Sequence, residues 1–373
     1  MRTPISISIV LITLLVAALA CKQTYLPPVV KSPPVNLVVE GFINNGPDST
    51  YFDLSTTYLL SDSTATTPIT GATVTVQGAD NSQYSLTEIG NGVYGAPLPT
   101  LNPAATYRLH ILTPDNKQYA SDYVPIVNDP PLDSINFIRN KTGVHVYANT
   151  HDPTGASQYY RYEYQEVWKF QSPYSASLKF ANGTLQNYAP NTTSVCWHYD
   201  NSTSIILAAS TQLSKAVIYE AQMVNIPLNS QQITIEYSIL VHQYAITKAA
   251  FDWWTQMQTN TENIGSIFGV QPSADQGNLH CLTDTTEQVI GYVSAGTVQS
   301  QRFFINNQQV QPWAYNSGCM EIQDGAGNAA SQYAAGVYPV NYHLFPGIVN
   351  YAYKTCVDCT LTGTNIKPSF WPN

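Results

Sequence analysis

Charged side chains are scarce in this sequence of 373 residues. Asp, Glu, Lys and Arg together make up 10% of the chain, whereas soluble domains usually carry about 25%. The 15 basic residues are outnumbered by 24 acidic ones, which gives a formal net charge of −9. Because such a protein repels phosphate backbones, nucleic acid is excluded as an expected partner. A hydrophobic content of 44% excludes intrinsic disorder.

Catalytic sequence patterns are also missing. The chain has no G-x-S-x-G elbow, no P-loop and no H-E-x-x-H motif, so the templates for serine hydrolases, nucleotide-binding enzymes and zinc proteases fail. Glu163 and Glu166 are three residues apart, which on a strand points them to opposite faces and spoils a paired-carboxylate site. His145 and His242 lie in strand patterns, where a hydrogen-bonded structural role is expected. We therefore predict no catalytic residue, no metal site and no cofactor.

The N-terminus carries a hydrophobic run that ends just before a cysteine. The run from Ile5 to Ala20 has no charged residue and follows Arg2, a pattern typical of a secretory signal and short of the roughly 20 apolar residues of a membrane span. The motif Ala18-Leu19-Ala20-Cys21 resembles the bacterial lipobox. We predict a lipoprotein signal peptide (1–20), lipid attachment at Cys21 and a Pro-rich tether (21–35). The alternative is a plain secretory signal.

The mature chain is dominated by short apolar runs between turn-forming residues. From Asn36 onward about seven such runs alternate at period two, which predicts an antiparallel β-sandwich, Ig-like or transthyretin-like, over residues 36–128. Val124 to Pro131 breaks the pattern, and its paired prolines cannot donate ladder hydrogen bonds, so we place a domain boundary there.

A larger β-rich domain with one or two helices is predicted over residues 132–373. Tyr159 to Phe170 reads as one long strand with aromatic residues at alternate positions. Thr247 is a plausible N-cap for a helix whose apolar stripe includes Trp253 and Trp254. This stripe is expected to pack the helix on a sheet, with ligand stacking by the two tryptophans as the alternative. Gly318 to Asn341 is predicted to be a flexible loop.

Five cysteines remain once Cys21 is assigned to the lipid. This odd number allows at most two disulfides and leaves one thiol over. Redox chemistry or a zinc site at the C-x-x-C motif is the alternative, but a redox motif needs a following helix and zinc a second close ligand pair. The predicted disulfide cysteines are Cys196, Cys281, Cys319, Cys356 and Cys359.

Several short segments together resemble a known protein family. They include Leu37-Val38-Val39-Glu40-Gly41, Cys196-Trp197, Tyr237 to Tyr244, Gly277-Asn278 and Cys356-Val357-Asp358-Cys359. In this order they resemble the lipoproteins of Bacteroidota described as domain of unknown function 4249. The resemblance implies an outer-membrane-associated lipoprotein, often encoded beside a TonB-dependent receptor, and it implies no catalytic residue.

Three functions follow as hypotheses. The first is a lipid-anchored binding or accessory protein at the outer membrane that captures a nutrient or docks on a TonB-dependent receptor. Its many Tyr, Trp, Asn and Gln residues suit a polar uncharged ligand such as a glycan. The second is a structural or adhesive envelope lipoprotein without a small ligand. The third, a hydrolase, requires convergent carboxylates or a Ser–His pair in one cleft.

Overall fold

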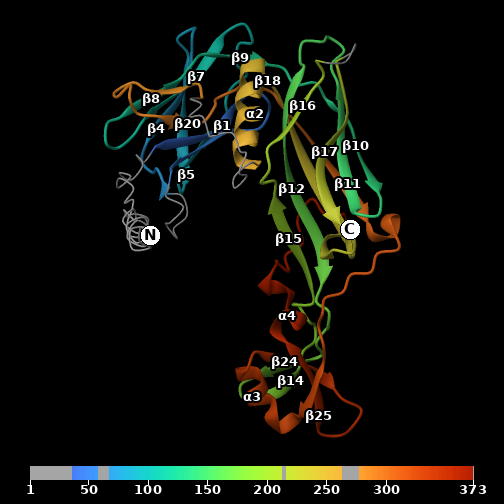
Figure 1. The fold of residues 1–373 in the computed structure, drawn as a ribbon. Helices are drawn as coiled ribbons and strands as arrows, with labels where there is room; N and C mark the ends of the chain where they lie inside the picture. Colours follow the sequence, from blue (N-terminus) through green and yellow to red (C-terminus); the bar gives the residue numbers. More distant parts are fainter. Residues whose placement is uncertain (1–35, 58–66, 212–215, 263–276, 373) are drawn as a thin grey trace, which may run out of the picture.

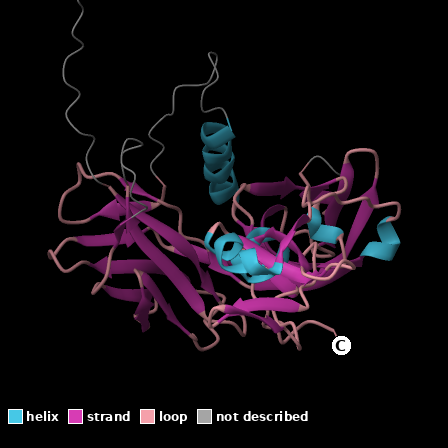
Figure 2. Cartoon of the chain, turned by 90° about the horizontal axis from the view of Figure 1, so that it is seen from below, coloured by secondary structure: helices cyan, strands magenta, loops and turns pink. Residues whose placement is uncertain are grey.

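The computed structural model describes residues 36–57, 67–211, 216–262 and 277–372. The predicted signal peptide, Cys21 and the tether lie outside these residues. The described chain is mainly β, as predicted, and forms a barrel, a pair of sheets beside it, and a smaller region at the far end of these sheets (Figure 1). Figure 2 shows strands throughout, with helices in a few places only. No helix of the described chain is long and apolar enough to cross a membrane.

Eight strands of the barrel close into a ring of hydrogen-bonded ladders. Their order is β7-β4-β5-β6-β2-β1-β21-β9, and β9 pairs back onto β7. The ring strands are β1 (Leu37–Asn44), β2 (Thr50–Thr56), β4 (Thr73–Gly78), β5 (Gln83–Gly90), β6 (Val93–Ala96), β7 (Thr106–Leu112), β9 (Val124–Val127) and β21 (Ala295–Gly296). Four short strands extend the same sheet: β3 (Thr67–Pro68), β8 (Gln118–Ser121), β19 (Leu279–Cys281) and β20 (Val289–Ile290).

The predicted N-terminal sandwich is not confirmed, because these ladders form one closed ring instead of two facing sheets. The short strands and their period-two burial are as expected, as in β7, where Tyr107, Leu109 and Ile111 are buried. A sandwich and a barrel share this alternation, so the pattern does not distinguish them. The segment read as a break contains β9, in which Pro125 stands opposite Thr106.

A distant part of the chain completes the barrel. The three strands between Leu279 and Gly296 pair with β8, β1 and β9, although this segment lies within the predicted second domain. The ring therefore takes its strands from both predicted ranges, 36–128 and 132–373. The domain limits themselves remain a prediction.

Two sheets beside the barrel face each other over one hydrophobic core. Alternate residues of the long strand β12 point into this core, including the fully buried Tyr160 and Tyr162, as the sequence predicts. One sheet contains β10 (Leu132–Arg139), β11 (Gly143–His151) and β17 (Val217–Pro227). The other contains β12 (Tyr159–Gln171), β15 (Val195–Asn201), β16 (Ile206–Ala209), β18 (Glu236–Ile246) and β22 (Val298–Asn306).

The region at the far end of the sheets, which we call the tip, combines residues 174–192 with residues 314–357 (Figure 1). The prediction of a flexible loop over Gly318 to Asn341 is wrong, because this stretch contains β23, α3 and most of β24. Its few apolar residues pack in two small hydrophobic cores with the segment around the β13–β14 hairpin, which comes much earlier in the chain. The elements are β13 (Leu178–Ala181), β14 (Thr184–Asn187), β23 (Ile322–Gly325), α3 (Ala329–Ala334), β24 (Val337–Tyr342), β25 (Ile348–Tyr353) and α4 (Lys354–Val357).

The helix predicted after Thr247 is α2 (Lys248–Glu262), which lies between the barrel and the sheets (Figure 1). With α3 and α4 of the tip, the described chain has three α-helices where one or two were predicted. The Thr247 hydroxyl accepts a hydrogen bond from the Ala250 amide at 3.2 Å, so the predicted N-cap is confirmed. Ala250 and Trp253 are buried and Trp254 is half-buried. The helix thus presents its apolar stripe to the rest of the molecule.

Candidate functional site

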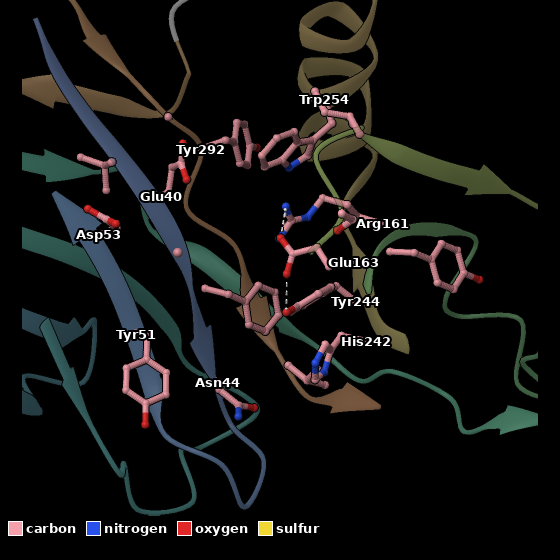
Figure 3. Close-up of a pocket in the computed structure, with 18 of the residues that line it drawn as sticks. Glu40, Asn44, Tyr51, Asp53, Arg161, Glu163, His242, Tyr244, Trp254 and Tyr292 are labelled. Atoms are coloured by element: carbon pink, nitrogen blue, oxygen red, sulfur yellow. Dashed lines mark hydrogen bonds and ion pairs between the residues drawn. The ribbon is translucent and has the colours of Figure 1, made fainter. Parts of the chain in front are cut away.

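A cleft of about 1100 Å³ lies where the outer surface of the barrel meets the outer surface of the β12–β18 sheet. Strand alternation creates both walls. Tyr160 and Tyr162 enter the core, so Arg161 and Glu163 are left on the opposite face of β12. By the same rule β18 turns Leu240, His242 and Tyr244 toward the cleft. Helix α2 closes one end (Figure 3).

The sheet wall is held by one hydrogen-bonded chain of side chains. The Arg161 guanidinium pairs with Glu163 at 2.8 Å, and the Tyr244 hydroxyl donates to the other Glu163 oxygen at 2.9 Å (Figure 3). The guanidinium also lies 4.4 Å from the ring centre of Trp254 and 4.9 Å from that of Tyr244. These contacts fix Arg161 between two aromatic rings and one carboxylate.

Aromatic residues line the helix end of the cleft. Trp253 contacts Trp254 edge-on with ring centres 4.8 Å apart, and it lies 5.7 Å from Tyr292. Trp253 is 9% exposed, and its indole Nε1 has no hydrogen-bond partner among the described residues. The helix stripe therefore both packs against the protein and presents indole surface to the cleft.

Three carboxylates line the cleft from the barrel side, those of Glu40, Asp48 and Asp53. Glu40 and Asp53 stand directly opposite each other on β1 and β2, and both are exposed (Figure 3). Beside this pair the backbones of β1 and β2 approach each other closely, because a Cβ on Gly41 would lie 2.4 Å from both the Phe52 ring and the Tyr51 carbonyl. Glycine is thus required for this pair of strands to meet as they do.

The cleft carries an excess of negative charge. Glu40 is exposed but partly desolvated by the cleft walls, and this desolvation raises its pKa. The charges of Asp53 and Glu163 raise it further, and the charge of Arg161 lowers it. Burial also raises the pKa of Asp53. For His242, burial lowers the pKa, which favours the neutral imidazole at neutral pH. The neutral imidazole of His242 therefore adds little positive charge to a cleft that is lined by carboxylates.

A Ser–His contact lies in the same cleft. His242 Nδ1 is 2.7 Å from the Ser300 hydroxyl on the neighbouring strand β22. Among the described residues no carboxylate hydrogen-bonds to the other ring nitrogen, as an orienting group would in a catalytic triad. His145, for which a structural role is predicted, makes a similar contact, with its Nε2 2.9 Å from the Thr142 hydroxyl.

Glu163 and Glu166 lie on opposite faces of β12, as predicted. Glu163 faces the cleft, whereas Glu166 is buried and accepts a hydrogen bond of 2.6 Å from the Tyr237 hydroxyl. Glu40, Asp53 and Arg161 line the cleft but are not among the site residues predicted from the sequence. The available signal was an outward-facing charge within an otherwise apolar strand pattern, in a chain where charge is rare.

Four of the predicted cysteines form two disulfides. The pairs are Cys196–Cys359 and Cys319–Cys356, with Cα separations of 5.8 and 5.9 Å. Cys281 is free and buried. The described cysteines form two bridges and leave one thiol, which agrees with the expected number, while the assignment of Cys21 to the lipid stays a prediction. The two cysteines of the C-x-x-C motif pair with distant partners and not with each other. One bridge links β15 to the segment after α4, and the other lies within the tip.

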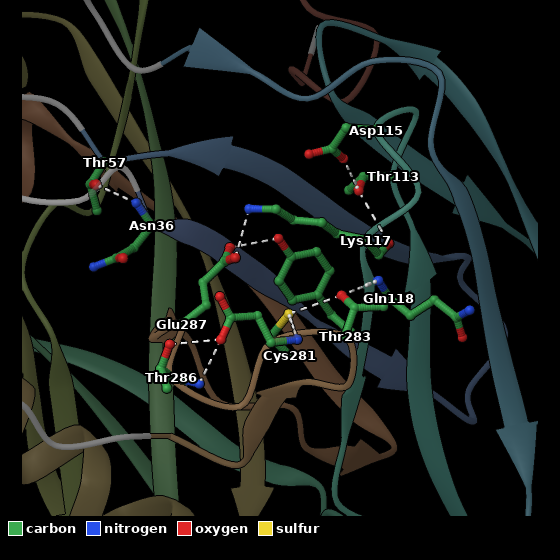
Figure 4. Close-up of polar contacts among 12 residues, drawn as sticks. Asn36, Thr57, Thr113, Asp115, Lys117, Gln118, Cys281, Thr283, Thr286 and Glu287 are labelled. Atoms are coloured by element: carbon green, nitrogen blue, oxygen red, sulfur yellow. Dashed lines mark hydrogen bonds and ion pairs between the residues drawn. The ribbon is translucent and has the colours of Figure 1, made fainter.

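The free thiol lies beside a polar network at one end of the barrel. Glu287 pairs with Lys117 at 2.6 Å and accepts a hydrogen bond from the Tyr119 hydroxyl at 2.7 Å (Figure 4). The Asp284 amide donates to Cys281 Sγ at 3.3 Å. These contacts attach the segment that follows β19 to β8 and to the turn before it, and Cys281 itself packs in the hydrophobic core of the barrel. In the described chain no three His, Cys, Asp or Glu side chains converge as metal ligands would.

Comparisons with known proteins identify a family without an assigned activity. No curated protein matches the chain. The adhesin InvE of Yersinia pseudotuberculosis, a solved structure, is 11% identical over 83% of this chain and 68% of its own, with a TM-score of 0.17. That score is too low to support an argument from its fold. The family model for a domain of unknown function, DUF4249, matches residues 22–302. The chain therefore belongs to the DUF4249 family.

Proposed function

We propose that this protein is a ligand-binding lipoprotein of the cell envelope, anchored at the outer membrane through Cys21, and that the cleft between barrel and sheet holds its ligand. The observation that supports this most is the composition of the cleft walls. Aromatic rings and hydrogen-bonding carboxylates face each other across about 1100 Å³, a size and lining typical of small-molecule sites.

A glycan is the ligand class that we propose. Sugar rings present apolar faces that stack on aromatic side chains, and the rings of Tyr292 and Trp254, the latter with Arg161 over one face, line the cleft. Sugar hydroxyls donate to carboxylates, and Glu163 is held rigidly by Arg161 and Tyr244 for this purpose. A ligand captured in this way would pass to a TonB-dependent receptor, which we propose as the partner in uptake.

Substitution of Trp254 tests the ligand site. Trp254→Ala should weaken binding of any glycan identified on an array by about tenfold, because a stacking face worth about 1 kcal/mol or more is lost. Tyr219→Ala is the matched control, since Tyr219 is 75% exposed and does not line the cleft. An array without any bound glycan, or equal affinities of both variants in calorimetry, would contradict the proposal.

The anchor and the receptor need separate tests. Radiolabelled palmitate should enter the wild-type protein and not Cys21→Ala, and only the wild type should stay with the membrane fraction. A receptor barrel should co-purify from detergent-solubilised envelopes. Recovery of the lipoprotein alone would count against the uptake role.

Two other functions each have one supporting observation. Leu344 and Phe345, 97% and 69% exposed on the tip, suit an adhesive role. The Ser300–His242 contact suits a hydrolase. A fluorophosphonate probe distinguishes the latter, because labelling that disappears in Ser300→Ala would establish a nucleophilic serine.

A further inference from the structure

We propose that the ligand of the cleft carries an aliphatic ammonium group, which binds between Glu40 and Asp53, so that the cleft selects amine-bearing sugars over their neutral counterparts. This inference rests on the proposed function and adds the charge of the ligand to it. It revises the expectation of an uncharged ligand.

The first step is the position of the two carboxylates. Glu40 and Asp53 are direct cross-strand partners in the β1–β2 ladder, so both side chains stand on the same outer face. Like charges directly opposite each other destabilise a sheet. Neither carboxylate has an ion pair or hydrogen bond within the described part of the chain. A bound cation would relieve this repulsion.

The second step is the charge balance of the cleft. Four carboxylates line it, those of Glu40, Asp48, Asp53 and Glu163, and Arg161 is the single Lys or Arg among its described lining residues. Arg161 is already paired with Glu163. With all four carboxylates ionised, the cleft has a formal net charge of −3, and the neutral form of His242 adds nothing to it. A cleft with one sign of charge concentrates ligands of the opposite sign.

The third step distinguishes an ammonium group from a metal ion. Calcium takes six to eight oxygen ligands and magnesium needs octahedral geometry. In the described chain no group of three or more potential metal ligands converges. An ammonium group needs only its three donors satisfied, which two carboxylates and a ligand or water oxygen achieve. The rings of Trp254 and Tyr292 in the same cleft can stack on the apolar face of the sugar that carries the amine.

A matched series of β-1,4-linked oligosaccharides tests this inference. Oligomers of glucosamine, N-acetylglucosamine and glucose differ only in the substituent at carbon 2. Calorimetry at a pH where the amine is protonated should show the glucosamine oligomer binding about tenfold more tightly than the other two, since a charge-assisted hydrogen bond is stronger than the neutral one that it replaces.

The variants are chosen to change charge without changing shape. The double variant Glu40→Gln with Asp53→Asn should lower the affinity for the glucosamine oligomer by about tenfold relative to the glucose oligomer measured on the same variant, which abolishes the preference for the amine. Glu321→Gln removes the same kind of charge on the tip and should behave as the wild type. Thermal unfolding of each variant checks that the cleft is intact. Both substituted side chains are exposed, so we expect no loss of the fold.

The outcomes separate this inference from the proposed function. If the neutral oligomer binds, loses affinity in Trp254→Ala, and equals the amine oligomer, the cleft binds glycans and the inference is wrong. If no oligomer and no array glycan binds, both proposals fail. A calcium-induced rise in melting temperature that disappears in the double variant would identify a metal site instead and overturn the ammonium assignment.

Discussion

Asp129 is a carboxylate buried where the chain passes from the barrel to the sheets. It is 6% exposed and accepts hydrogen bonds from the Gln243 side chain at 2.9 Å and from the Gln299 amide at 3.2 Å. Its own backbone amide donates to the Thr297 hydroxyl at 2.8 Å. This hydrogen bond joins the two chain segments that lead from the barrel to the sheets, one after β9 and one after β21. Burial outweighs these hydrogen bonds and raises the pKa of Asp129 to about 8.

This pKa predicts how stability varies with pH. Between about pH 4 and pH 8 the folded state keeps a proton that the unfolded state has lost, so the free energy of unfolding should fall as the pH rises. Each pKa unit corresponds to about 1.4 kcal/mol, so the decrease should reach a few kcal/mol. Urea titrations across this range should show a much smaller slope for Asp129→Asn. Parallel profiles for the two proteins would contradict the assignment.

At the scale of elements, helix α2 sets the position of the cleft aromatics. Its first turn is fixed by the Thr247 cap, and its stripe places Trp253 and Trp254 beside β12 and the Ile290–Tyr292 segment. The second half of the helix is also held, because the Gln258 side-chain amide donates to the Ile205 carbonyl at 2.9 Å.

Loss of the cap should affect both stability and the cleft. Thr247→Ala should lower the free energy of unfolding by about 1 kcal/mol, because the Ala250 amide loses its acceptor. Thr255→Ala is the control: this exposed threonine lies in the same helix, and its replacement by alanine should be neutral or slightly stabilising. Chemical denaturation followed by circular dichroism measures both. Equal stabilities of the two variants would refute the capping role.

At the scale of the whole molecule, the chain crosses between barrel and sheets and then returns. Asn278 fixes the returning segment, because its side-chain amide both donates to and accepts from the Val293 backbone, at 2.9 and 2.8 Å. The segment then supplies β21, which stands between β1 and β9 in the ring. The barrel is therefore not complete within a continuous N-terminal range.

A fragment experiment tests this dependence. Residues 36–131 expressed alone should lack a cooperative thermal transition, because β1 and β9 are left with unpaired edges. The same fragment fused through a Gly-Ser linker to residues 278–297 should regain a cooperative transition. Calorimetry measures both. A fragment that melts as cooperatively as the fusion would show that β21 is dispensable.

The sequence predicted those features that depend on neighbours along the chain. Alternation identified the long strand β12, and the Thr247 cap with its apolar stripe located α2. The opposite faces of Glu163 and Glu166 also followed from spacing alone. The tip was missed, because its cores are small and depend on packing against the β13–β14 hairpin over 130 residues away.

The sequence by itself determined that this protein is built of short strands and carries few charges. Closure of the barrel and the pairing of each cysteine were decided only in the tertiary structure, because a period of two does not encode which distant strand or thiol becomes the partner. The cleft has the same origin. Glu40 and Arg161 are 121 positions apart in the sequence, and they share one cleft only because the outer faces of the barrel and the sheet meet.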